Sequence, residues 1–178
     1  MTTLTVTGVT VARASGTLTN NGTNVSDGDS FTVVTTVYTF KTTLTTTSAA
    51  LATTAYEVKI GSSALNSMLN AVAAVNDSGV GYSAALAATT SQYNVAAPHA
   101  TVRASEILTN PASAPAITLT AVMAGTLGNA VALAKSGATL SVSGALFTGG
   151  TDAVTITGTL SDATYTQPIR QVTVGDYP

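Results

Sequence analysis

The sequence lacks cysteine and tryptophan, and it contains a single histidine, His99. Without cysteine, the chain forms no disulfide bond and offers no thiolate to a metal ion. A zinc site would then consist almost entirely of carboxylates, which zinc rarely uses. His99 follows Pro98 with no recognisable partner for acid–base catalysis beside it in sequence. We therefore interpret it as a solvent-facing or loop histidine.

Charged residues are also scarce. They make up 8% of the chain, against about 25% in an ordinary soluble domain. The net charge of −2 provides no basic surface, so we expect no nucleic-acid partner. A surface of Thr, Ser, Ala and Asn repels copies of itself weakly, which favours dense packing in an assembly. The alternative interpretation is an unusual secreted or repeat-like composition.

A long, purely apolar segment is missing too. The most membrane-like window, residues 117–134, is interrupted by threonine, glycine and asparagine. We interpret it as a buried strand that runs into a turn and a short helix at residues 130–134, and we expect no membrane association. Met1 precedes a Thr-rich stretch without the basic and apolar regions of a signal peptide, so we expect none.

The strongest signal that is present is a β-hairpin at residues 27–40. An acidic turn containing glycine opens it, and two short runs of β-branched and aromatic residues follow. Phe31 and Val33 fall on one face of the first arm, and Tyr38 and Phe40 fall on one face of the second. We expect these side chains to form the centre of the core.

One helix is clearly indicated at residues 62–76, after a strand at residues 56–60. In the strand, Glu57 is expected to point outward because its neighbours in sequence are apolar. In the helix, apolar residues recur at three- and four-residue spacing: Leu65, Met68, Leu69, Val72 and Val75. Ser62 or Ser63 is suited to cap the start, and Gly79 to take the left-handed position after the end.

The whole pattern predicts an α+β fold, mostly antiparallel β-sheet with one principal amphipathic helix. Further strands are predicted at residues 100–105, 116–122 and 139–143. We divide the chain into an N-terminal β arm (1–26, with a loop from residue 15), a core (27–152) and a C-terminal β arm (153–178). Arms of this kind commonly extend the sheet of a neighbouring subunit.

No motif predicts a catalytic, cofactor-binding or metal-binding residue. Asp27-Gly28-Asp29 lacks the rest of a calcium loop, so we interpret it as a turn that opens a strand. The segment 125–129 lacks the Lys-Ser/Thr ending of a phosphate loop and the third glycine of a dinucleotide site, which favours a plain turn. Asp152 has the same interpretation, and the remaining acids, such as Glu57 and Glu106, are isolated in sequence.

Four pieces, taken in order, resemble one β-rich structural module of tailed-bacteriophage virion proteins. They are Asp-Gly-Asp-x-Phe-Thr-Val with Tyr-Thr-Phe-Lys (27–41), Glu-Val-x-Ile-Gly (57–61), the leucine-spaced helix (65–76), and Thr-Ala-x-x-Ala-Gly-Thr-x-Gly-Asn-Ala-Val (120–131) with a closing Gly-Gly-Thr-Asp (149–152). The sequence departs from the module at the hairpin tip. There, Val34-Thr35-Thr36 stands where a tight-turn pair such as Asn-Gly is usual, so we expect a wider turn.

The resemblance implies a non-enzymatic structural role in the virion, in a head-decorating, collar or tail protein. We expect a capsid decoration or cement protein whose partners are copies of itself, in a trimer or other ring, and major capsid or other virion proteins. A tail or collar protein is the alternative. A host-surface adhesin is less favoured, because its site would need clustered aromatics and Tyr82, Tyr93 and Tyr165 are scattered.

Overall fold

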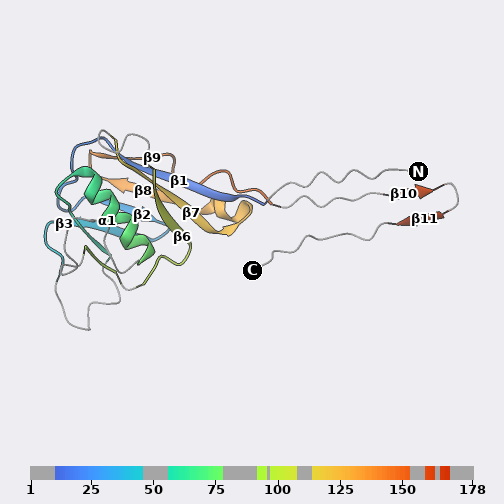
Figure 1. Cartoon of the computed structure of the whole chain (residues 1–178), viewed down its shortest axis with the longest axis horizontal. Helices are drawn as coiled ribbons and strands as arrows, with labels where there is room; N and C mark the ends of the chain where they lie inside the picture. The colour runs from blue at the N-terminus through green and yellow to red at the C-terminus, as the bar shows by residue number, and fades with distance from the viewer. Residues whose placement is uncertain are drawn as a thin grey trace.

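The computed structural model describes residues 11–45, 56–77, 92–95, 97–107, 114–152, 159–162 and 165–168. These residues form two mostly antiparallel sheets and one α-helix, which confirms the predicted strand-rich α+β class (Figure 1). The elements are β1 (Arg13–Asn20), β2 (Ser30–Val33), β3 (Thr36–Lys41), β4 (Glu57–Lys59), α1 (Ala64–Asn76), β5 (Tyr93–Asn94), β6 (Val102–Ile107), β7 (Ala116–Ala124), η1 (Thr126–Ala130), β8 (Leu133–Ser136), β9 (Leu140–Val142), β10 (Thr159–Asp162) and β11 (Tyr165–Pro168).

The five-stranded sheet, ordered β5-β4-β3-β2-β8, contains the predicted hairpin as β2 and β3. Phe31 pairs with Tyr38, and their rings stack at 4.8 Å between centroids. Together with Val33 and Phe40, these side chains are completely buried, so the predicted centre of the core is confirmed. Only the β3–β4 pair in this sheet is parallel.

The hairpin tip is tight, so the expectation of a wider turn is wrong. Val33 pairs with Thr36, which leaves Val34 and Thr35 as the loop. Val34 takes a positive φ of 56°. Two-residue hairpin loops need such left-handed backbone to match the strand twist, although it is costly for a β-branched residue. The register of the hairpin therefore holds Val34 in a strained conformation.

The four-stranded sheet, ordered β6-β7-β1-β9, is antiparallel throughout. The strand predicted at residues 116–122 is present as β7, and Ile117, Leu119 and Ala121 on its inward face are buried. β1 lies between β7 and β9, so the loop expected from residue 15 is wrong for residues 15–20. This part of the predicted N-terminal arm belongs to the sheet, and residues 1–10 of that arm lie outside the described residues.

Helix α1 confirms the predicted helix and its cap. The Ser63 hydroxyl accepts a hydrogen bond from the Asn66 backbone nitrogen at 3.2 Å. The left-handed position after the end is taken by Asp77, with φ 45°, and not by the predicted Gly79, which lies outside the described residues. The helix contacts β4 and β5 at one end of the five-stranded sheet and β6 and β7 at one end of the four-stranded sheet, and so joins these two ends (Figure 1).

The buried face of α1 is rotated from the predicted one. Its buried side chains are mostly small: Ala64, Ser67, Met68, Asn70, Ala71, Ala73, Ala74 and Val75. Of the predicted face, Leu65, Leu69 and Val72 are only half-buried. Small side chains let the helix backbone approach both sheets closely. The face that turns inward is therefore the one that allows this close approach, and not the one with the largest apolar side chains.

The segment after β7 differs in part from its prediction. The expected strand and turn are present as β7 and the 3₁₀ helix η1, but the helix expected at residues 130–134 is wrong. Leu133 instead begins β8, which pairs with β2 through Thr32 and Ala134. Pairing with a distant strand thus overrides the weak local preference of an Ala-rich stretch.

Within residues 153–178, the described strands β10 and β11 form an antiparallel hairpin. Among the described strands they pair only with each other, and Figure 1 draws them away from both sheets. The division at residues 26 and 152 remains a prediction.

Candidate functional site

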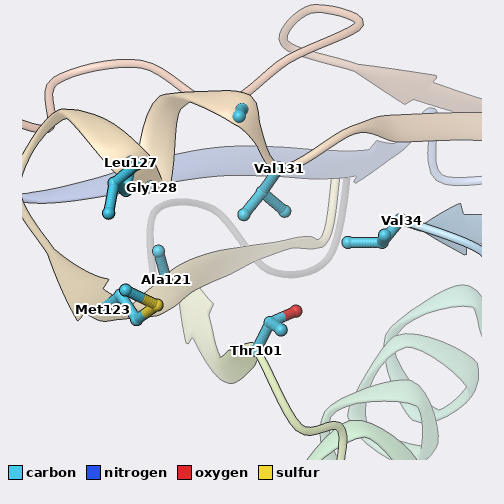
Figure 2. A pocket seen from close by; sticks show the side chains of 8 residues that line it. Val34, Thr101, Ala121, Met123, Leu127, Gly128 and Val131 are labelled. Atoms are coloured by element: carbon cyan, nitrogen blue, oxygen red, sulfur yellow. The ribbon is translucent and has the colours of Figure 1, made fainter.

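In the part of the chain that the structure describes, a candidate for a binding surface is an apolar cleft of about 170 Å³. It opens between the tip of the β2–β3 hairpin, the end of β7 and the helix η1 (Figure 2). We call it the apolar cleft, and its lining residues are Val34, Thr101, Ala121, Met123, Leu127, Gly128, Ala130 and Val131. Figure 2 shows Val34 on the side opposite Met123 and Leu127, with Val131 and Thr101 between them.

Three large apolar side chains of the cleft are in contact with solvent. Val34 is 44% exposed, Met123 58% and Leu127 69%. Beneath them, Ala121 and Val131 are buried and continue into the core. Covering such side chains removes apolar surface from water, which is the main driving force of protein association. The cleft is therefore suited to apolar contact with another molecule.

The position of η1 depends on Gly125 and Asp152. Gly125 has φ 88°, and a Cβ there would lie 2.2 Å from an oxygen of Asp152, so only glycine fits. The Asp152 carboxylate accepts hydrogen bonds from the Thr126 backbone nitrogen at 2.7 Å and from the Thr126 hydroxyl at 2.5 Å. These two bonds hold the pKa of Asp152 below its usual value, and the bond from the hydroxyl has the larger effect.

A second contact joins the same two segments. The Asn129 side chain donates to the Gly150 carbonyl oxygen at 3.0 Å and accepts from the Gly150 nitrogen at 2.9 Å. The segment 125–129, predicted as a plain turn, leads into the short 3₁₀ helix η1, whereas Asp152, for which a turn was also predicted, lies in irregular backbone after the isolated bridge between Thr151 and Ala12. Their mutual contact was not predicted, because nothing in a single sequence connects segments about 25 residues apart. Together they support the wall of the cleft that carries Leu127.

The sequence indicated a solvent-facing or loop histidine at position 99. His99 does lie in a loop, but it does not face the solvent. It is only 6% exposed. Its Nε2 lies 3.3 Å from the Val33 carbonyl oxygen, and its Nδ1 lies 3.2 Å from the backbone nitrogen of Thr101, which donates to it. Burial lowers the pKa of His99, the Val33 contact opposes this, and the charge of Arg103 adds to the lowering.

The acids that the sequence singled out at the hairpin entrance bind backbone groups. Asp27 accepts from the Thr42 nitrogen at 2.6 Å, which is the largest cause of its lowered pKa. Asp29 accepts from the Ser26 nitrogen at 2.9 Å. Lys41 lies 3.9 Å from Asp27. These contacts are those of a turn that opens a strand, the interpretation preferred over a calcium loop.

Glu57 was wrongly expected to point outward. It is 8% exposed, and its carboxylate accepts from the backbone nitrogen and the hydroxyl of Thr45, both at 2.7 Å. The alternating pattern could not show this, because the partner comes from a loop outside the strand. Glu57 holds that loop against β4, which is a structural role.

The lining of the cleft is suited to apolar packing against another molecule. Among its lining residues, only Thr101 offers a polar side-chain group. Across the described ranges, no three histidine or acidic side chains gather closely enough to hold a metal ion. In the same ranges, no helix has the length and apolar character needed to cross a membrane. The cleft itself was missed at the sequence level, because its exposed side chains come from three separate segments.

The chain matches no protein-family model, and neither a curated protein nor a solved structure shows significant similarity to it. The resemblance of residues 27–152 to a virion module therefore remains an interpretation of the sequence. What the chain does has to be argued from its surface and its strands.

Proposed function

We propose that this chain is a non-enzymatic structural protein of a tailed-bacteriophage virion, most specifically a capsid decoration or cement protein. On this proposal it acts through contacts with copies of itself, in a trimer or other ring, and with capsid subunits. The order of the four sequence pieces motivates the virion assignment. The observation that carries the assembly role is the placement of the β10–β11 hairpin.

That hairpin is a two-stranded ribbon whose strands pair only with each other among the described strands. An isolated two-stranded hairpin is marginally stable in water, because it buries little surface for the entropy that it loses. Both of its edges present backbone groups suited to pairing with another strand. Docking on a neighbouring subunit would supply the missing contacts, by the addition of strands to a sheet.

The surface of the folded body supports the same proposal. Besides the cleft residues, Val37, Val122 and Leu146 are large apolar side chains with 37% to 54% of their area exposed. Few charges are available to keep copies apart, since charged residues make up 8% of the chain. A surface that repels neighbouring copies only weakly and carries several exposed apolar side chains suits a subunit that is packed in a dense shell.

The adhesin alternative gains no support from the aromatic residues that the structure describes. Phe31, Tyr38 and Phe40 pack against one another in the core, and the ring of Tyr56 meets Tyr38 edge-on. Tyr93 is 9% exposed, and its hydroxyl donates to Asp77 at 3.1 Å. Sugar-binding sites usually need exposed rings, so these residues are better explained as core.

The deciding experiment compares the full chain with a chain that lacks residues 154–178. Both are added to particles devoid of the protein, and the bound protein is located by gold labelling in electron microscopy. We expect the full chain to saturate the heads and the truncated chain to bind weakly. Urea unfolding of the body should be nearly the same in both.

Two controls make the result interpretable. A Met123→Ser variant with the arm intact separates loss of the arm from loss of apolar surface. Solution mass, by light scattering, shows whether the full chain forms a ring before it binds. Label over the tail or collar would replace the cement assignment by the alternative. Truncated protein that saturates particles with unchanged affinity would refute the role of the arm.

A further inference from the structure

His99 joins three separate elements of the fold through backbone contacts. Its own nitrogen donates to the carbonyl oxygen of Val75, in the last turn of α1, at 2.8 Å. Its Nε2 lies against the carbonyl oxygen of Val33, the residue before the hairpin tip, and Thr101, just before β6, donates to its Nδ1. We call these four residues, with Arg103, the His99 junction.

The partners determine the protonation state of the ring. The Val33 carbonyl oxygen only accepts, so Nε2 must carry the hydrogen. The Thr101 backbone nitrogen only donates, so Nδ1 must present a lone pair. Both requirements are met by one neutral tautomer. A second proton, on Nδ1, would point at the Thr101 N–H group and abolish that hydrogen bond.

We infer that the His99 junction is an acid-sensitive contact, closed near neutral pH and opened when Nδ1 is protonated in mildly acidic solution. Opening frees the segment that leads into β6 from the ring, whose Nε2–H continues to donate to Val33 at the hairpin tip. Both border the apolar cleft, because Thr101 lines it and Val33 directly precedes Val34. Acid would therefore change the shape of this surface. The inference does not depend on the proposed virion role.

The groups around the ring act on its charge in different directions. From β6, the guanidinium of Arg103 donates to the His99 carbonyl oxygen at 2.5 Å and places a cation beside the ring. From β3, the Tyr38 ring lies 6.2 Å away, and burial keeps the Tyr38 hydroxyl neutral by raising its pKa. The Val33 carbonyl oxygen, which contacts Nε2, favours the cation and partly offsets the lowering of the pKa of His99.

The Thr101 hydroxyl is the group that could moderate the effect. It lies 3.3 Å from Nδ1 and can rotate to accept a proton from it. The backbone N–H of the same residue cannot reverse its role, so one buried donor still loses its partner. Protonation thus costs a hydrogen bond even when the hydroxyl adapts.

The direction of the pH dependence follows from the lowered pKa of His99. The unfolded chain takes up a proton near pH 6.5, before the folded chain does. Stability is therefore unaffected above this pH and falls as the pH drops between the unfolded and folded values. In this window the opening equilibrium constant rises by at most about tenfold per pH unit, the limit for one proton.

The first test follows the imidazole itself by NMR. The chain has one histidine, so every imidazole signal belongs to His99. We expect a titration midpoint below 6.5 and, at neutral pH, nitrogen shifts of the Nε2–H tautomer. A midpoint at or above 6.5, or the opposite tautomer, would overturn the inference. This test uses the wild-type protein and needs no variant to fold.

The second test measures local opening by amide hydrogen exchange at about pH 7.5 and about pH 5. The Thr101 amide should lose more protection in acid than the Leu119 amide in the middle of β7, once intrinsic exchange is corrected. His99→Gln provides the control, because its amide can still donate toward Val33 but does not titrate. Equal acid sensitivity in this variant, or equal changes at Thr101 and Leu119 in the wild type, would also overturn the inference.

Discussion

The side-chain amide of Asn76 pairs with the backbone of Ala104 through two hydrogen bonds. Nδ2 donates to the carbonyl oxygen at 2.8 Å, and Oδ1 accepts from the backbone nitrogen at 2.9 Å. β6 is an edge strand of its sheet, so the amide occupies backbone groups that would otherwise be open. An uncovered edge is a site for unwanted pairing with other chains. The end of α1 thus protects the edge of the sheet beside it.

Replacing Asn76 by alanine should destabilise the protein by about 1–3 kcal/mol, because two buried backbone groups of Ala104 lose their partners. The measurement is urea unfolding followed by circular dichroism. Asn66→Ala is a matched control on the same helix, since among the described residues the Asn66 side chain donates to the exposed Ser62 hydroxyl. We expect the control to change stability by no more than about 0.5 kcal/mol. Equal changes in the free energy of unfolding for the two variants would show that the contact with Ala104 does not stabilise the protein more than the exposed contact does.

Gly125→Ala should be more harmful than Gly149→Ala. Both positions have positive φ, 88° and 86°, so each substitution costs on the order of 1–3 kcal/mol of backbone strain. At Gly149 the new methyl group meets nothing within 4 Å, whereas at Gly125 it would lie 2.2 Å from Asp152. The difference between the two free energies of unfolding measures the displacement of Asp152. No difference would contradict the proposed support of η1.

Asp152→Asn should lower the urea midpoint at neutral pH, because the two Thr126 donors bind different oxygens of the carboxylate and an amide keeps only one oxygen, which is uncharged. The folded-state pKa of Asp152 is lowered, so its contribution is present above 3.8 and is lost as the pH falls through the folded value. The midpoints of wild type and variant should therefore converge in strong acid.

Thr126→Val, combined with Asp152→Asn in a double-mutant cycle, isolates the hydroxyl–carboxylate term. A gap between wild type and Asp152→Asn that persists unchanged below pH 3.8 would assign the effect to something other than the charge.

Val34→Asn should stabilise the protein by about 1 kcal/mol. Val34 is held at φ 56°, where asparagine is tolerated far better than a β-branched residue. Thermal and urea unfolding would detect the gain. Val37→Asn is the matched control: Val37 is 46% exposed and lies within β3, where asparagine is unfavourable, so this change should destabilise slightly. A loss of stability in Val34→Asn would mean that apolar contacts of Val34 outweigh its strain.

The elements that were predicted correctly carry their information locally. In β2, β3 and β7, large apolar side chains alternate with polar ones, so the inward face is visible in a few consecutive residues. In α1, the serine cap and the three- and four-residue spacing are equally local. Which face of α1 is buried could not be predicted in the same way, because strands of both sheets contact the helix.

β1 shows why other elements were missed. Its inward positions are Ala14, Gly16, Leu18 and Asn20, among which only Leu18 is a large apolar residue. The bulk comes from elsewhere: a Cβ on Gly16 would lie 2.7 Å from the ring of Phe147. A strand whose inward face is completed by a residue more than 100 positions away has no alternating pattern to detect.

By itself, the sequence determined the strand-rich α+β class, the aromatic centre of the core, and the scarcity of charge that leaves this protein weakly repulsive toward its own copies. The tertiary structure alone decided that His99 is buried, that Glu57 has a partner, and that Val34, Met123 and Leu127 border one cleft. The physical reason is range. Backbone periodicity is set by neighbouring residues, whereas burial and hydrogen bonding of a polar group depend on segments that meet only when the chain has folded.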